Sequence, residues 1–145
     1  ATLGTLGPIH HQINEEFIEV LNINAISNHR LIRSFDALLK NSKKPKALFL
    51  TSSLVSKPKP FWGAYSVSKA ALEHIVKIWA LENNHNNLSI SIIDPGKTDT
   101  PMRKKAMPGE GSKNLNKPVD VAKTIINEIF SDKIYKGEII KVNNI

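Results

Sequence analysis

A tyrosine and a lysine, Tyr65 and Lys69, stand four residues apart in the segment WGAYSVSKA. Residues at this spacing lie on one face of an α-helix, so the lysine ammonium can approach the phenol. A nearby cation favours the phenolate and lowers a pKa that otherwise lies near 10. A tyrosine in this setting can act as a general acid or base near neutral pH. The pair therefore predicts proton transfer, provided that other segments meet at the same point.

Segments with helical and strand-like patterns alternate along the chain. Apolar residues at helical spacing predict one long helix or two in tandem over 15–40, and another helix over about 62–84. A third helix is expected from Pro118, since proline favours the first turn. Its expected core face consists of Val119, Val121, Ile125, Ile126 and Ile129. Short apolar runs predict strands at ALFLTSS (47–53), LSISII (88–93) and KGEIIKVN (136–143).

The order of these elements places several polar segments at one edge of a sheet. Alternating helices and strands predict an α/β fold with a parallel sheet and right-handed crossovers. Ligands of such sheets bind outside the carboxyl ends of the strands. The pair Ser52-Ser53, the turn Asp94-Pro95-Gly96 and the helix start with Tyr65 should therefore meet there. A serine hydroxyl at this edge could hold a carbonyl or alcohol oxygen against the phenol. The polar segment 97–117 is typical of a lid or a disordered loop.

Four of these segments resemble, in the same order, motifs of the short-chain dehydrogenases/reductases, and the resemblance covers nearly the whole chain. The quoted motifs are the Y-x-x-x-K pattern in WGAYSVSKAAL, the serine that ends LFLTSS, the asparagine in FIEVLNINA, and the turn in DPGKTDTPM. The final KGEIIKV is similar to the last strand of the family. The resemblance implies an NAD(P)-dependent oxidoreductase of Rossmann-like fold that interconverts a carbonyl and an alcohol on a small molecule.

The same resemblance implies roles for the catalytic candidates. Tyr65 would be the proton donor or acceptor, and Lys69 would lower its pKa and hold the nicotinamide ribose. A serine would position the substrate oxygen. The family's spacing to the tyrosine favours Ser52, whereas the alignment of the strand end favours Ser53, which we take as the candidate.

Further candidates come from the helix before and the turn after this pair. Asn24 matches the family asparagine that binds a water in the proton relay. Asn22 is its nearest alternative, and a capping or helix-surface asparagine is the simpler structural interpretation. The turn that contacts the nicotinamide side of the cofactor would comprise Pro95, Gly96, Thr98 and Thr100.

One family motif has no counterpart in this sequence. None of the seven glycines forms the T-G-x-x-x-G-x-G turn that holds the cofactor pyrophosphate. The opening ATLGTLGP resembles the segment after the family's fourth strand. We therefore expect one domain over 1–145 that corresponds to the C-terminal portion of the fold, with about three strands and without the N-terminal dinucleotide-binding half. The strand at 47–53 should then form an exposed edge, and the choice between NAD and NADP would reside in the other half.

Composition narrows the possible partners. The chain has no cysteine, which excludes disulfides and thiolate sites and fits a cytoplasmic protein. The histidines lack zinc-ligand spacing, so no metal site is expected. No apolar run reaches membrane-spanning length, and the scattered lysines behind the net charge of +7 lack interleaved aromatics, so neither membrane nor nucleic acid is expected. Expected partners are a substrate and either a homo-oligomer or a complementing N-terminal half. The alternative is a non-catalytic remnant that acts as an oligomerisation or interaction module.

Overall fold

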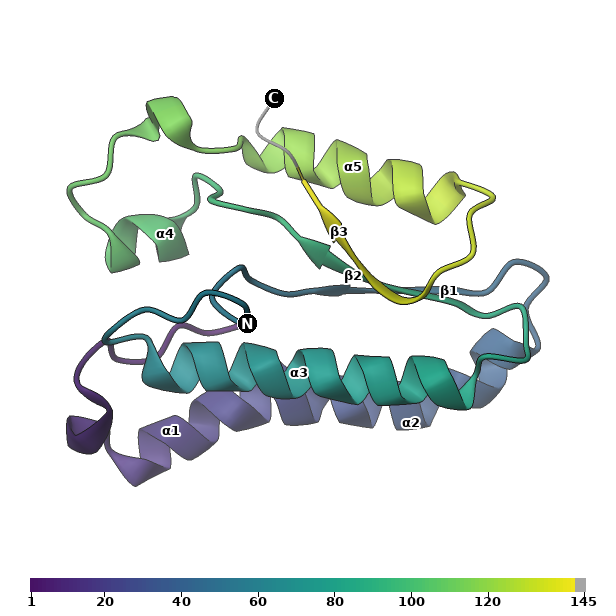
Figure 1. The fold of residues 1–145 in the computed structure, drawn as a ribbon, viewed down its shortest axis with the longest axis horizontal. Coiled ribbons are helices and arrows are strands. Elements are labelled where there is room, and N and C mark those ends of the chain that lie inside the picture. Colours follow the sequence, from purple (N-terminus) through teal and green to yellow (C-terminus); the bar gives the residue numbers. More distant parts are fainter. Residues whose placement is uncertain (143–145) are drawn as a thin grey trace.

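A three-stranded parallel sheet forms the centre of the computed structural model, which describes residues 1–142 (Figure 1). The strands are β1 (Lys46–Leu50), β2 (Ser89–Asp94) and β3 (Lys136–Lys141), arranged in the order β1-β2-β3. In this register Leu50 lies opposite Ile93, so β1 and β2 end side by side. The expected α/β fold with a parallel sheet is confirmed, and β1 is an edge strand.

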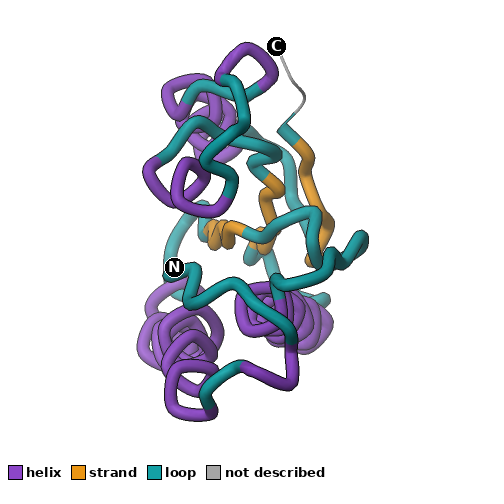
Figure 2. Tube along the Cα trace, turned by 90° about the vertical axis from the view of Figure 1, so that its left-hand side faces the viewer, coloured by secondary structure: helices purple, strands orange, loops and turns teal. Residues whose placement is uncertain are grey.

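Helices cover both faces of the sheet, as Figures 1 and 2 show. On one face lie α1 (Asn14–Leu21), α2 (Ser27–Lys40) and α3 (Gly63–Glu82), and on the other lies α5 (Pro118–Phe130). The remaining helical segments are η1 (Ile9–His11), η2 (Asn22–Ile26), α4 (Pro101–Ala106) and η3 (Ser112–Asn114). The sheet is thus the middle layer of three.

The expected long helix over 15–40 is two helices in tandem. They are joined by η2, a turn of π-helix in which the ladder takes one extra residue. The N-terminal segment lies against α1: Gly4 has a φ of +69°, and a Cβ there would lie 2.7 Å from Val20 Cγ2. Glycine is required here by both the backbone conformation and the close approach.

Strand β2 supplies the centre of the core. Its residues are all buried, and alternate side chains point to opposite faces. Ile90 and Ile92 pack with α3, whereas Ile93 packs with Val121 of α5 and with Val142. Burial on both faces explains why the segment reads as a nearly continuous apolar run.

Three sequence-based expectations need correction. The strand at 47–53 ends at Leu50, and the two serines lie in the turn that follows. The loop at 97–117 contains α4 and η3. In α5, the burial expected for three residues is wrong, because a narrow sheet meets only one strip of the helix; the exposed residues are Val119, Ile126 and Ile129. The last residue of the strand expected over 136–143 lies outside the described residues.

Candidate active site

Tyr65 and Lys69 lie on the first two turns of α3, and the expected proximity is confirmed. Lys69 Nζ is 5.9 Å from the centroid of the Tyr65 ring. The helix start is fixed from outside, since Gln12 Oε1 accepts a hydrogen bond from Ala64 N at 3.0 Å. Trp62, the residue before the helix, contacts the Tyr65 ring edge-on with centroids 6.0 Å apart. The Tyr65 ring therefore lies between Lys69 of the same helix and Trp62 of the preceding loop.

The electrostatics of the pair differ from the expectation. Burial of the phenol raises the pKa of Tyr65; a hydrogen bond with the Ser52 side chain opposes this shift, and the Asp94 carboxylate adds to it. Lys69 is buried, which lowers its own pKa, and its Nζ donates to Leu50 O at 2.9 Å. The pKa of Tyr65 is therefore raised overall, because burial outweighs the hydrogen bond with Ser52. The lowering effect expected of Lys69 stays a prediction.

Ser52, rather than the expected Ser53, is the serine at the phenol. The Ser52 side chain is half-buried and interacts with Tyr65. Ser53 is exposed, and its carbonyl accepts hydrogen bonds from Lys57 N and Ser56 Oγ within the following turn. The choice of Ser53 is therefore corrected: because β1 ends before the serine pair, the alignment that treated both as strand residues placed the wrong one at the edge.

Asn24 lies in η2 with 1% of its surface exposed. Its Oδ1 accepts from Thr2 N at 2.7 Å, and its Nδ2 donates to Thr2 O at 2.8 Å and to Ser68 Oγ at 2.9 Å. Ser68 Oγ in turn donates to Tyr65 O at 2.7 Å. Asn22, the alternative candidate, is exposed. Asn24 thus connects the N-terminal segment with the helix turn that carries Tyr65, while its water-binding role stays a prediction.

The turn after β2 lies at the same edge. Asp94 Oδ1 accepts from Gly96 N at 3.0 Å, and Gly96 has a φ of +66°, a conformation that favours glycine. Asn116 Nδ2 donates to Pro95 O at 2.9 Å. Thr98 Oγ1 donates to Pro95 O at 3.1 Å. The expected nicotinamide-side turn is therefore a closed, hydrogen-bonded structure.

The last candidate of this turn, Thr100, stands slightly apart. Its Oγ1 accepts from Arg103 N at 3.2 Å and caps the start of α4. The hydroxyl therefore has a structural task in the described residues, and its contact with a cofactor stays a prediction.

Sequence reasoning missed several polar residues of this edge. Ser68 stands three residues after Tyr65, so helical spacing could have identified it. Asn116 carried no such signal, because its partner Pro95 is remote in sequence. Thr51 and Glu73 form a buried hydrogen bond of 2.6 Å between the end of β1 and α3, again across a long stretch of sequence.

The described range, residues 1–142, shows neither a metal-binding cluster nor a membrane-spanning helix. No group of three or more His, Asp or Glu side chains in this range is arranged to hold a metal ion. Within the same described range, no helix is both long enough and apolar enough to cross a membrane.

The described residues fit one end of a dinucleotide. A phenol, an ammonium and several hydroxyls at the strand edge suit the ribose and carboxamide of a nicotinamide. A pyrophosphate needs open backbone at a glycine-rich helix start. Gly63 begins α3, but a Cβ there would lie 2.4 Å from Ile9 Cδ1, so protein atoms already fill that space. The residues thus fit the nicotinamide end and offer no pyrophosphate cradle within 1–142.

Residues 1–111 match the family model described as short chain dehydrogenase. The chain belongs to the short chain dehydrogenase family. It is 30% identical over 119 residues to the oxidoreductase YciK of Escherichia coli, covering 82% of this chain and 47% of that protein. It is 27% identical over 161 residues to a benzil reductase of Bacillus cereus, covering 98% of this chain and 64% of the relative.

Solved structures of the family superimpose closely on this chain. A short chain dehydrogenase from Pseudomonas syringae has a TM-score of 0.91 at 29% identity, covering 97% of this chain and 58% of that one. One from Shigella flexneri, complexed with NADP, has a TM-score of 0.89 at 28% identity, covering 96% of this chain and 58% of that one. The fold is therefore Rossmann-like, and the chain spans about half the length of the relatives that it matches.

Proposed function

We propose that the protein to which this chain contributes is an NAD(P)-dependent oxidoreductase that interconverts a carbonyl and an alcohol on a small molecule. The observation that carries this proposal is the meeting of Tyr65, Lys69 and Ser52 at the carboxyl edge of a parallel sheet. Family membership and the oxidoreductase relatives support the reaction class.

In carbonyl reduction, the Ser52 hydroxyl donates a hydrogen bond to the substrate oxygen, and Tyr65 transfers its phenolic proton to that oxygen. The nicotinamide, when bound, supplies the hydride that reduces the carbonyl carbon. Burial keeps the pKa of Tyr65 above its ordinary value, so the phenol carries its proton at neutral pH. This protonated state is the one that a general acid needs in carbonyl reduction.

The remaining candidates surround this proton. Lys69 would hold the nicotinamide ribose, and Asn24 would bind the water through which Tyr65 regains a proton. The nicotinamide-side contacts would come from Pro95, Gly96, Thr98 and Thr100. Family structures complexed with NADP or NADPH support a nicotinamide dinucleotide, and the selection between NAD and NADP would lie outside these contacts.

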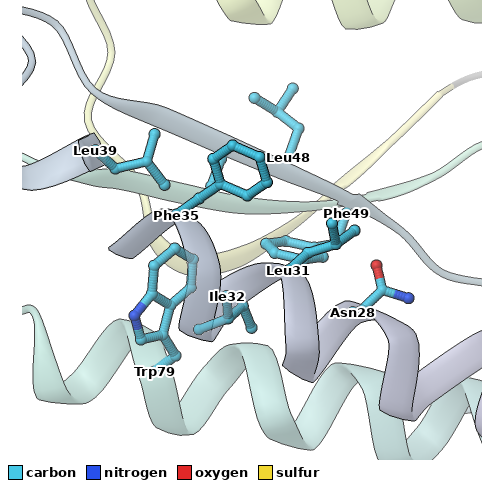
Figure 3. Close-up of a pocket in the computed structure, with 9 residues that line it drawn as sticks. Asn28, Leu31, Ile32, Phe35, Leu39, Leu48, Phe49 and Trp79 are labelled. Carbon is cyan, nitrogen blue, oxygen red and sulfur yellow. The ribbon is translucent and has the colours of Figure 1, made fainter. Parts of the chain in front are cut away.

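The outer edge of the sheet supplies a docking surface for the rest of such an enzyme. A groove of about 290 Å³ lies between α2 and β1, lined by Leu31, Ile32, Phe35, Leu48 and Phe49 among others (Figure 3). The chain covers 47% of the length of its relative YciK, so the rest of such a protein has room for further strands. Strand β1 is the edge to which another strand can add. We assign the groove and this edge to a complementing N-terminal half of the fold.

A second candidate function rests on the outer surfaces of the helices. Large apolar side chains are exposed along α2 and α3, with Leu38, Ile78 and Leu81 among them. Exposed apolar patches of this kind mark protein interaction sites. These helices would then build a homo-oligomer, and the chain would serve as a non-catalytic oligomerisation or interaction module.

The test is to assemble this chain with an N-terminal half carrying the glycine-rich turn and to measure NADH and NADPH binding and carbonyl reduction. Tyr65→Phe should lower turnover by roughly a hundredfold or more, because it removes the acid. Tyr135→Phe is the matched control, since the Tyr135 hydroxyl bonds Glu128 away from the site. Unchanged turnover in Tyr65→Phe would overturn the assignment, and a stable oligomer without nicotinamide binding in any assembly would support the interaction module.

A further inference from the structure

A buried carboxylate, Glu73, lies one turn beyond Lys69 on α3. The Glu73 side chain is 6% exposed. Its Oε1 accepts from Thr51 Oγ1 at 2.6 Å, and its Oε2 accepts from Lys77 Nζ at 3.1 Å. A buried carboxylate is costly unless hydrogen bonds or a charge compensate it. Here each oxygen has a partner, so the carboxylate has a fixed orientation toward Thr51.

The group that Glu73 holds is the end of β1. Thr51 N donates to Ile93 O at 2.8 Å, and the preceding carbonyl, Leu50 O, accepts from Lys69 Nζ at 2.9 Å. Together with the Thr51 hydroxyl, these contacts fix two consecutive residues to β2 and to α3.

Ser52 is the next residue along the chain. Its own hydroxyl accepts from Leu54 N at 3.3 Å, a long hydrogen bond within the turn. The residue before it, Thr51, is held by more contacts. Thr51 is 3% exposed and held through both its backbone and its side chain.

We propose that Glu73 is a positioning residue: through the Thr51 hydroxyl it fixes the end of β1 and thereby holds the Ser52 hydroxyl against the Tyr65 phenol. The catalytic meaning of this contact rests on the proposed function. The contact itself exists without a cofactor, so it can be tested without turnover. Failure of one proposal is therefore distinguishable from failure of the other.

Ionisation of Tyr65 reports the contact directly. The chain has two tyrosines, so Tyr135→Phe leaves Tyr65 as the single phenol, whose pKa can be followed by ¹³Cζ NMR in labelled protein. Hydrogen bonding with Ser52 lowers this pKa, whereas burial and the Asp94 carboxylate raise it, and Lys69 faces the same ring. Loss of the Ser52 contact should therefore raise the pKa of Tyr65.

The decisive variant is Thr51→Val, which removes the hydroxyl with little change of volume and no change of charge. It should raise the pKa of Tyr65 by the same amount as Ser52→Ala, and the double variant should show no further rise. Glu73→Leu should act in the same direction.

Two control variants separate position from charge. Glu73→Gln keeps an oxygen acceptor for Thr51 and should retain the Ser52 contact, and Lys77→Gln removes only the outer ion pair. Both should leave the pKa of Tyr65 closer to that of the parent than Thr51→Val does.

The proposal is overturned if Ser52→Ala raises the pKa of Tyr65 while Thr51→Val leaves it unchanged. It is also overturned if Thr51→Val gives its full rise in the Ser52→Ala background, because Thr51 would then act on the phenol by another route. Circular dichroism at each pH confirms that the variants are folded. If Glu73→Leu does not fold, the comparison of Thr51→Val with Ser52→Ala still decides.

Discussion

The carboxyl edge of the sheet and the outer edge of β1 differ in the polarity of their side chains. At the carboxyl edge, buried polar groups are paired with one another, as Asn24 is with Thr2 and Ser68. Along β1 and α2, large apolar side chains such as Phe35 and Leu50 stay exposed. The first region is closed by contacts within this chain, whereas the second presents a surface that another segment could cover. Contacts among the described residues therefore set the local geometry of the candidate site. The same residues leave the apolar surface along β1 and α2 uncovered.

The largest effect is expected at the carboxyl edge of the sheet, where the buried polar groups are paired. Asn24→Ala removes hydrogen bonds to Thr2 and Ser68 and leaves their buried polar atoms unpaired. It should lower the free energy of unfolding by about 3 kcal/mol. Asn22→Ala, at an exposed position of the same turn, should change it by less than about 0.5 kcal/mol. Urea denaturation of both variants gives the comparison, and equal losses would show that the network at Asn24 does not stabilise the fold.

A somewhat smaller effect is expected at the outer edge of β1, and it is measurable only when the chain associates with an N-terminal half. Phe35 lines the groove and is 49% exposed. Phe35→Lys should weaken association with an N-terminal half by roughly tenfold to a hundredfold, since an apolar contact is lost and a charge is introduced. Ser34→Lys adds the same charge at an exposed neighbouring position outside the groove. Isothermal titration calorimetry measures both, and equal affinities would exclude the groove as the docking surface.

The smallest effect is expected in the segment 97–116, which follows the turn after β2. Arg103 bonds Glu110 through its guanidinium, and together with Lys97 it lowers the pKa of Glu110 from its ordinary 4.5 to about 2. A depressed folded-state pKa gives a stabilising contribution that is complete above the ordinary value and is lost as the pH falls toward 2. The protection factors of amides in 97–116, which are corrected for the intrinsic pH dependence of exchange, should fall in this window. Glu110→Gln should abolish that pH dependence, and its persistence would assign the dependence to another group.

How far the sequence predicted this molecule depends on the range of the contacts involved. Tyr65 and Lys69 were found because helical spacing is a local property, and the strand ends were found because parallel topology brings them to one edge. The choice between Ser52 and Ser53 failed because it needed the last residue of β1, and a one-residue shift reverses the side to which a side chain points. The raised pKa of Tyr65 depends on burial and on Asp94, which only the folded chain brings near.

The same distinction applies to the elements. The order of helices and strands followed from periodicity, whereas the exposure of Val119 and Ile126 on α5 did not. An apolar stripe states which residues could be buried, but the width of the facing sheet decides which of them are. The sequence therefore specified the elements better than their partners.

The π-turn at Asn22–Ile26 also sets how far α1 is rotated about its axis relative to α2. Each residue of an α-helix turns the chain by about 100°, so deleting one residue from this turn would rotate α1 by roughly that angle relative to α2. Val20 would then leave its place beneath Gly4, and Asn24 would turn away from Ser68. The number of residues in this turn, together with the identity of Asn24, thus sets whether the N-terminal segment and the tyrosine helix are joined.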